Sequence, residues 1–119
     1  QTRSFMYIDD CLEGTKKIFN SDLKDPYNLG SDEQVSINQL IEITENVSNF
    51  KVKKNYLLDK PKGVRGRSSN NDKLKEVLKW NYSVKLHEGI KKTYSWIYEN
   101  MIKNDPESLK FIKPDLKSS

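Results

Sequence analysis

The sequence alternates short β-like runs with capped, amphipathic helices, and this alternation restricts the fold more than any other feature. β-like runs are expected at residues 3–8, 27–29 and 50–58, the last of them interrupted by lysines. A helical pattern follows each run. This order is typical of α/β proteins, but three short strands are too few for a complete doubly wound sheet. We therefore predict an α/β fold that is part of a larger protein.

Four helices are expected from their caps and their apolar periodicity. Asp10 with Glu13, and Ser36 with Gln39, have the spacing of a capping box. The first helix should end at Asp25-Pro26, and a third should follow a cap within residues 70–72. The fourth should open at Ser83 and has the clearest apolar stripe of the chain, which comprises Leu86, Ile90, Thr93, Tyr94, Ile97 and Met101. We assign residues 1–103 to one domain and residues 104–119 to a polar tail.

The charge and the cysteine content narrow the class of protein. The net charge is +4, but most lysines stand among carboxylates on helix faces, which favours solvated faces over a nucleic-acid footprint. Cys11 is the only cysteine, so it forms no internal disulfide and fits a reducing compartment. No apolar run approaches the roughly 20 residues of a membrane span. We expect a cytoplasmic protein, and the abrupt β-like start at Gln1 suggests a fragment.

The residues provide no evident catalytic machinery. A Gly-x-Gly-x-x-Gly phosphate loop is absent, and His87 has no second His or Cys at metal-ligand spacing. Cys11 falls on the apolar face of its helix, where a buried thiol is more common than a nucleophile. Asp9-Asp10 reads as a helix start. We therefore predict no catalytic residue, no metal site and no bound cofactor in this chain.

Two arginine-bearing segments are the remaining candidates for a binding site. Arg3 follows Gln1 and Thr2, whose amide and hydroxyl groups can bind a polar ligand. Arg65 and Arg67 stand among glycines shortly before a helix. Guanidinium groups match phosphate geometry, and glycines let the backbone approach a ligand closely. Taken alone, this second segment fits a basic surface loop equally well.

Four blocks carry a resemblance to a known family. They occur in the order QTRSF with the following IDD-C-EG, NLGSDEQVS, GVRGRSS and GIKKTYSWI. Together they resemble the extended short-chain dehydrogenase/reductases, and more narrowly the GDP-mannose 3,5-epimerase family, over residues 1–103.

The resemblance implies both a fold and a role. The chain would be the C-terminal, substrate-binding part of an NAD-dependent sugar-nucleotide epimerase, without the N-terminal Rossmann half that binds NAD and carries the catalytic Tyr-x-x-x-Lys. Cys11 would match a non-catalytic cysteine of the family. Such a chain would be inactive alone and would bind a GDP-mannose-like nucleotide sugar. The residues that would hold its diphosphate are Gln1, Thr2, Arg3, Arg67 and, as a second candidate, Arg65.

Departures from the family pattern leave the nucleotide and the sugar open, and the basic charge and the abrupt start leave two other functions open. Asn70 replaces an acid at the helix cap, Lys79 replaces a glycine before Trp80, and residues 50–58 are unusually rich in lysine. The alternatives are a small basic nucleic-acid-binding module and a non-catalytic interaction module. A homodimer formed through exposed apolar surface is also left open.

Overall fold

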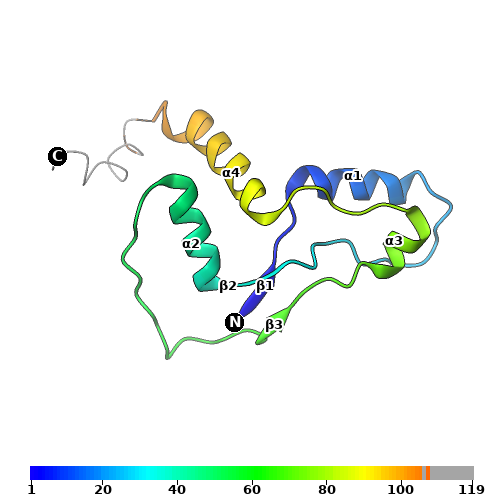
Figure 1. Cartoon of the computed structure of the whole chain (residues 1–119), viewed down its shortest axis with the longest axis horizontal. Coiled ribbons are helices and arrows are strands. Elements are labelled where there is room, and N and C mark those ends of the chain that lie inside the picture. Colours follow the sequence, from blue (N-terminus) through cyan, green and yellow to red (C-terminus); the bar gives the residue numbers. More distant parts are fainter. Residues whose placement is uncertain (106, 108–119) are drawn as a thin grey trace.

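A small mixed sheet organises the chain in the computed structural model, which describes residues 1–105 and 107. Strand β1 lies in the centre, antiparallel to β2 and parallel to β3. Figure 1 shows α1 and α4 along one edge of the molecule, with α2 beside the sheet. The elements are β1 (Thr2–Ser4), α1 (Ile8–Phe19), β2 (Gln34–Ser36), α2 (Ile37–Ser48), β3 (Gly66–Arg67), α3 (Asp72–Leu78), α4 (Leu86–Ile97) and the π-helix η1 (Tyr98–Ile102). The predicted α/β class is confirmed.

Helix α2 begins as its sequence predicts. The Ser36 hydroxyl accepts a hydrogen bond from the Gln39 backbone N–H at 3.1 Å, and the Gln39 side chain accepts one from the Ser36 N–H at 2.7 Å. This reciprocal capping box satisfies two backbone donors that a helix start leaves unpaired. The strand β2 therefore passes directly into α2.

Helix α1 differs from the prediction at both ends. It starts at Ile8 after an uncapped Tyr7, so Asp10 lies inside the first turn and forms no capping box with Glu13. The helix ends at Phe19, well before Asp25-Pro26. Asp10 is instead 2% exposed and bonds to Ser83 and Val84, residues that are distant in sequence. The expected cap was wrong because that carboxylate has a tertiary role.

The strands are the poorest part of the sequence interpretation. Residues 27–29 and 50–58 form no strand, whereas β2 ends at the predicted helix cap Ser36 and β3 lies in the segment that fitted a basic surface loop. The expected strand at 3–8 is reduced to β1. β2 and β3 are two or three residues long and largely polar, so they have no apolar alternation to detect. They are strands because β1 provides their hydrogen-bonding partners.

Helix α4 starts later than expected. It begins at Leu86 rather than Ser83, because Ser83 is held by Asp10. Helix α3 begins at Asp72, within the range predicted for its cap, and ends at Leu78, after which the C-cap Lys79 has a positive φ of 53°. The predicted polar tail, residues 104–119, lies outside the described residues except at positions 104, 105 and 107.

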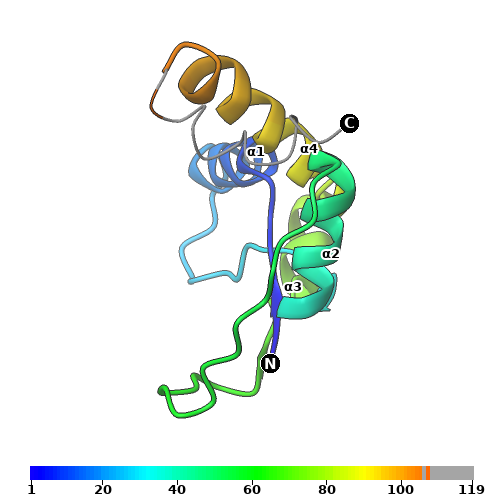
Figure 2. The ribbon, with the colours of Figure 1, turned by 90° about the vertical axis from the view of Figure 1, so that its left-hand side faces the viewer.

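The buried core is small and the molecule is thin. Only three hydrophobic residues are buried among those described, namely Leu74, Tyr82 and Leu86. Gly14 of α1 packs closely against Leu29 and Trp80, since an added Cβ would lie 2.6 Å from Leu29 and 2.8 Å from Trp80. Figure 2, turned by 90°, shows the helices and the sheet from the narrow side of the molecule.

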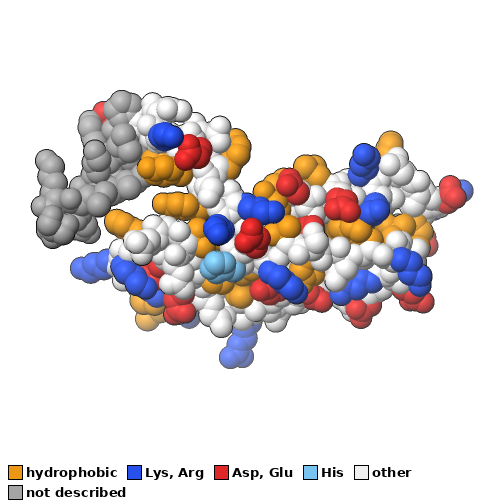
Figure 3. Space-filling view, turned by 45° about the horizontal axis from the view of Figure 1, so that its top comes forward, with side chains coloured by type: hydrophobic (Ala, Val, Ile, Leu, Met, Phe, Trp, Pro, Cys, Tyr) orange, Lys and Arg blue, Asp and Glu red, His pale blue; other side chains and the backbone are white. Residues whose placement is uncertain are grey.

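Many large apolar side chains remain at the surface. Phe19 is 85% exposed, and Ile8 and Leu12 of the same helix are also exposed. Figure 3 shows hydrophobic side chains lying among charged ones across one face. No helix in the described part of the chain is both long enough and apolar enough to span a membrane.

Candidate anion-binding site

The parallel pairing of β1 and β3 brings two predicted site residues together. Thr2 is opposite Gly66 and Arg3 is opposite Arg67 in the register of the two strands. Residues at matching positions of neighbouring strands point to the same face of a sheet. Arg3 and Arg67 accordingly line one cleft of about 480 Å³, together with Ser31, Ser68 and Ser69. Residues 64 positions apart thus form one pair of guanidinium groups.

Gly66 allows β3 to approach β1. A Cβ added at this position would lie 2.7 Å from the Thr2 hydroxyl oxygen, which is too close for an ordinary contact. A side chain at position 66 would therefore require either the Thr2 hydroxyl to rotate away or the strands to separate, and separation would move Arg67 away from Arg3. The glycine provides the space for this close approach.

Gln1 orients the guanidinium of Arg3. When the Gln1 amide is assigned with its oxygen, rather than its nitrogen, toward the two neighbouring donors, this oxygen lies 3.2 Å from both Arg3 Nη2 and the Gly63 nitrogen and can accept a hydrogen bond from each. Arg3 Nη1 also donates to the Thr2 carbonyl at 2.7 Å. These contacts hold Arg3, which is half-buried, while Arg67 is exposed.

The other two predicted residues are placed differently. Thr2 contributes its backbone, since its N–H donates to the Arg65 carbonyl at 2.9 Å, and it lines neither this cleft nor the larger cavity nearby. Arg65 lines that larger cavity, of about 920 Å³, together with Gln1. The structure therefore pairs Arg3 with Arg67 and places Arg65 apart.

The arginines have no acidic partner in the part of the chain that the structure describes. Its ion pairs are Lys51–Glu45, Lys75–Asp32 and Lys103–Glu99, all of which use lysine. The sequence has only three arginines among 21 basic residues, and all three lie on or beside the sheet. Unpaired guanidinium groups repel each other and attract an anion, so the cleft favours a phosphate-bearing ligand.

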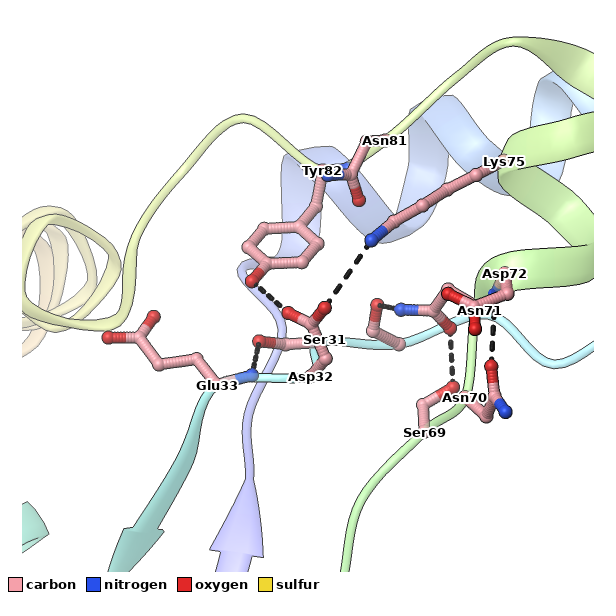
Figure 4. A network of polar contacts seen from close by, with 11 residues as sticks. Ser31, Asp32, Glu33, Ser69, Asn70, Asn71, Asp72, Lys75, Asn81 and Tyr82 are labelled. Atoms are coloured by element: carbon pink, nitrogen blue, oxygen red, sulfur yellow. Dashed lines mark hydrogen bonds and ion pairs between the residues drawn. The ribbon is translucent and has the colours of Figure 1, made fainter.

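A polar network holds the segments that contribute Gly30, Ser31 and Ser69 to the lining of the cleft (Figure 4). The Tyr82 hydroxyl donates to the Asp32 carboxylate, and Lys75 forms an ion pair with the same carboxylate at 3.3 Å. The side-chain amide of Asn71 donates to the Gly30 carbonyl, and its oxygen accepts from the Ser69 hydroxyl. These bonds join the 30–33 segment to α3 and to the segment before α4.

The hydrogen bond between Tyr82 and Asp32 affects both ionisation equilibria. The bond from the tyrosine hydroxyl, and then the contacts with Lys75, lower the pKa of Asp32 below its ordinary value. The same bond, and then burial, raise the pKa of Tyr82. At neutral pH both pKa shifts favour an ionised Asp32 carboxylate paired with a neutral Tyr82 hydroxyl. Sequence reasoning missed this pair because its members are 50 positions apart.

One Tyr-x-x-x-Lys spacing, from Tyr56 to Lys60, occurs in this chain, although the family resemblance places the catalytic motif in the N-terminal half. On a helix this spacing would put both side chains on one face. Here the segment is irregular, and the Tyr56 hydroxyl donates to the Asn38 side chain at 3.1 Å. Within the described ranges no group of three potential metal ligands occurs.

Comparison with known proteins shows relatives of one kind. The chain is 45% identical over 105 residues to GDP-mannose 3,5-epimerase from Arabidopsis thaliana, an alignment that covers 87% of the chain and 27% of that protein. It is 35% identical over 102 residues to UDP-glucuronate 4-epimerase from Thermodesulfobacterium geofontis, covering 85% and 32%. No protein-family profile matches the chain.

Solved structures agree with the sequence comparison. UDP-glucuronic acid 4-epimerase from Bacillus cereus, in complex with UDP-glucuronic acid and NAD, superposes with a TM-score of 0.75 at 30% identity. The match covers 83% of this chain and 32% of that one. The chain thus spans about a third or less of the length of these relatives.

Proposed function

Because this chain is homologous to the C-terminal part of extended short-chain dehydrogenase/reductases, we propose that it is the nucleotide-sugar-binding part of an NAD-dependent sugar-nucleotide epimerase. Its task is to hold the substrate, and the chemistry belongs to a Rossmann half with which it associates. We expect the chain by itself neither to bind NAD nor to turn over substrate.

The pairing of Arg3 with Arg67 is the observation that supports this proposal. Two guanidinium groups without an acidic partner, at one register position of the sheet, match the charge of a diphosphate, and each fork can bind phosphate oxygens in pairs. Gln1 limits the rotation of Arg3, so less conformational entropy is lost when the ligand binds. Fixing the diphosphate also positions the sugar relative to a cofactor on the other half.

The names of the relatives narrow the substrate class. They include GDP-mannose and UDP-glucuronate epimerases, whose substrates differ in base and sugar and share a diphosphate. We propose a GDP-mannose-type nucleotide sugar for this chain. The exposed apolar side chains of α1, among them Ile8, Leu12 and Phe19, offer a surface that the Rossmann half would cover.

Calorimetric titration with GDP-mannose tests the proposal. The Arg67→Ala and Arg3→Ala variants should each bind at least about ten-fold more weakly than the unmodified chain, because each loses a charge-assisted contact with the diphosphate. Lys91→Ala on α4 is the matched control: it removes the same charge from an exposed position far from the cleft. Its affinity should be nearly unchanged.

Two results would contradict the proposal. Equal loss of affinity in Arg67→Ala and Lys91→Ala would indicate attraction by net charge rather than a site. Binding to duplex DNA with a steep salt dependence, and no response to GDP-mannose, would favour the nucleic-acid alternative.

A further inference from the structure

Two segments that are distant in the sequence meet at the arginine cleft. Residues 28–31 line it, and so do residues 67–69, which include Arg67. The two segments are in direct contact, because a Cβ added to Gly30 would lie 2.6 Å from the Ser69 Cβ. The distance between them therefore limits where Arg67 can lie.

Asn71 joins the same two segments through its side chain. The amide nitrogen donates to the Gly30 carbonyl, and the amide oxygen accepts from the Ser69 hydroxyl (Figure 4). The Gly30 carbonyl can only accept a hydrogen bond, so the nitrogen must face it, and this fixes the orientation of the amide. Asn71 is 5% exposed and does not line the cleft, so it acts on the two segments and not on a ligand.

Capping of helix α3 does not explain the side chain of Asn71. Asn71 is the N-cap residue of α3, a position at which an asparagine side chain commonly accepts a bond from a backbone N–H of the first turn. It makes no such bond here, and the Asp72 N–H donates to the Asn70 side chain at 3.1 Å instead. The two neighbouring asparagines thus divide two tasks, with Asn70 bonded to the helix start and Asn71 bonded to the cleft segments.

Strand β3 depends on what holds the chain at its two ends. It has two exposed residues, so its own pairing with β1 is weak. Just before it, the Arg65 carbonyl accepts from the Thr2 N–H at 2.9 Å. Just after it, Ser69 is bound by Asn71. Arg67 lies between these two attachments, so loss of either one allows it to move away from its partner arginine.

We propose that Asn71 is a positioning residue of the nucleotide-sugar site, which joins Ser69 to Gly30 and so holds Arg67 opposite Arg3 before a ligand binds. This inference rests on the proposed function, in which the two arginines hold the diphosphate. A side-chain amide suits the task because it supplies one donor and one acceptor, whereas a carboxylate supplies acceptors only and would repel the Gly30 carbonyl. Arginines arranged in advance lose less conformational entropy on binding.

Hydrogen exchange of the Thr2 N–H tests the positioning without any ligand. This N–H reports the pairing of β1 with the segment that enters β3. The Asn71→Ala variant should exchange it about ten-fold faster, because one attachment of β3 is lost and the open population rises. The Val84 N–H, which donates to a buried carboxylate outside the cleft, should keep its rate in the same variant. Equal acceleration of both amides would indicate a general loss of stability and overturn the inference.

Asn70→Ala is the matched control for this measurement. It removes the same side chain from the next position, which is exposed, and with it the bond to the Asp72 N–H. The Thr2 exchange rate should change less than about two-fold, because the bonds to Gly30 and Ser69 remain. A control that accelerates Thr2 exchange as much as Asn71→Ala does would contradict the role of Asn71.

Calorimetric titration with GDP-mannose measures the effect on the site. Asn71→Ala should weaken binding about five-fold, and Ser69→Ala, which removes one of the two bonds, about two-fold. Asn71→Asp should weaken it more than Asn70→Asp, although both variants add the same charge, because only the first removes the donor to Gly30. Equal effects of the two aspartates would indicate charge repulsion alone and overturn the inference.

The two measurements separate this inference from the proposed function. Faster Thr2 exchange in Asn71→Ala, in a chain that binds no GDP-mannose even when unmodified, supports the attachment of β3 and counts against the proposed function alone. An unmodified chain that binds GDP-mannose, with the same affinity in Asn71→Ala, leaves the proposed function intact and overturns the role of Asn71.

Discussion

The two sides of the sheet are held in opposite ways. On the β2 side, the 30–33 segment is fixed by Asp32, Tyr82 and Asn71, and Asp10 fixes the nearby segment before α4. On the β3 side, the irregular segment of residues 50–65 is held to α2 by the buried Glu45 carboxylate and the Tyr56 hydroxyl, and to β1 by the hydrogen bond from the Thr2 N–H to the Arg65 carbonyl. On the first side the carboxylates are paired with hydrogen-bond donors or with a lysine. On the second side, cations that form no ion pair among the described residues line the larger cavity. The chain thus combines a rigid wall with an adjustable one, an arrangement that suits a binding site.

The strongest test of the rigid side is Asp10→Ala. The buried carboxylate accepts hydrogen bonds from Ser83 N–H at 3.2 Å, Ser83 Oγ at 3.1 Å and Val84 N–H at 2.8 Å. Removing it leaves these donors unpaired, and we expect a loss of about 3 kcal/mol in the free energy of unfolding. Urea denaturation measures this loss.

Asp9→Ala is the control for that measurement. Asp9 is in the same helical turn but exposed, so it contributes only a charge near the helix start, and its loss should cost about 0.5 kcal/mol. Similar losses in both variants would show that the rigid side is not held by Asp10.

Gly66→Ala tests the close approach of β3 to β1, where residues 50–65 reach the sheet. The added methyl group would meet the Thr2 hydroxyl, so we expect a loss of about 1–2 kcal/mol and weaker GDP-mannose binding as β3 moves away from β1. Thr2→Ala in the same chain removes the clashing oxygen and should restore most of both losses. An unrescued double variant would mean that glycine is required at position 66 for another reason.

The smallest effect is expected for Tyr82→Phe, and it depends on pH. Losing the hydroxyl should cost about 1 kcal/mol at neutral pH. Because the pKa of Asp32 is lowered in the folded state, its contribution is present above the ordinary carboxyl value of 3.8 and is lost as the pH falls through the lower, folded value. The difference between the variant and the unmodified chain should therefore shrink below about pH 4. A difference that is constant with pH would contradict the role of the ionised Asp32.

The sequence revealed those features whose partners are close along the chain. The capping box of Ser36 and Gln39 spans three residues and was predicted correctly. The pairing of Asp10 with Ser83 and that of Tyr82 with Asp32 span 73 and 50 positions, and no local pattern reports them. Strand β3 was missed because two residues have no periodicity.

The candidate site was predicted only in its composition. The arginine segments were identified, but the sequence could not state that Arg3 and Arg67 are in register or that Arg65 faces another cavity. Spacing along the chain does not determine strand register, which is set by the hydrogen bonds between the strands. The roles of Gln1 as an orienting residue and of Thr2 as a backbone contact are visible only in three dimensions.

The shortness of β3 has a consequence for affinity. A ladder of two residues has few hydrogen bonds, so we expect its pairing with β1 to be an equilibrium in which only the paired population presents both arginines to a ligand. The apparent dissociation constant is then the intrinsic one divided by that population, so a strand paired half of the time doubles the measured Kd. Another polypeptide or small molecule that raises the paired population would increase the affinity for the nucleotide sugar in the same proportion, without contacting the nucleotide sugar itself.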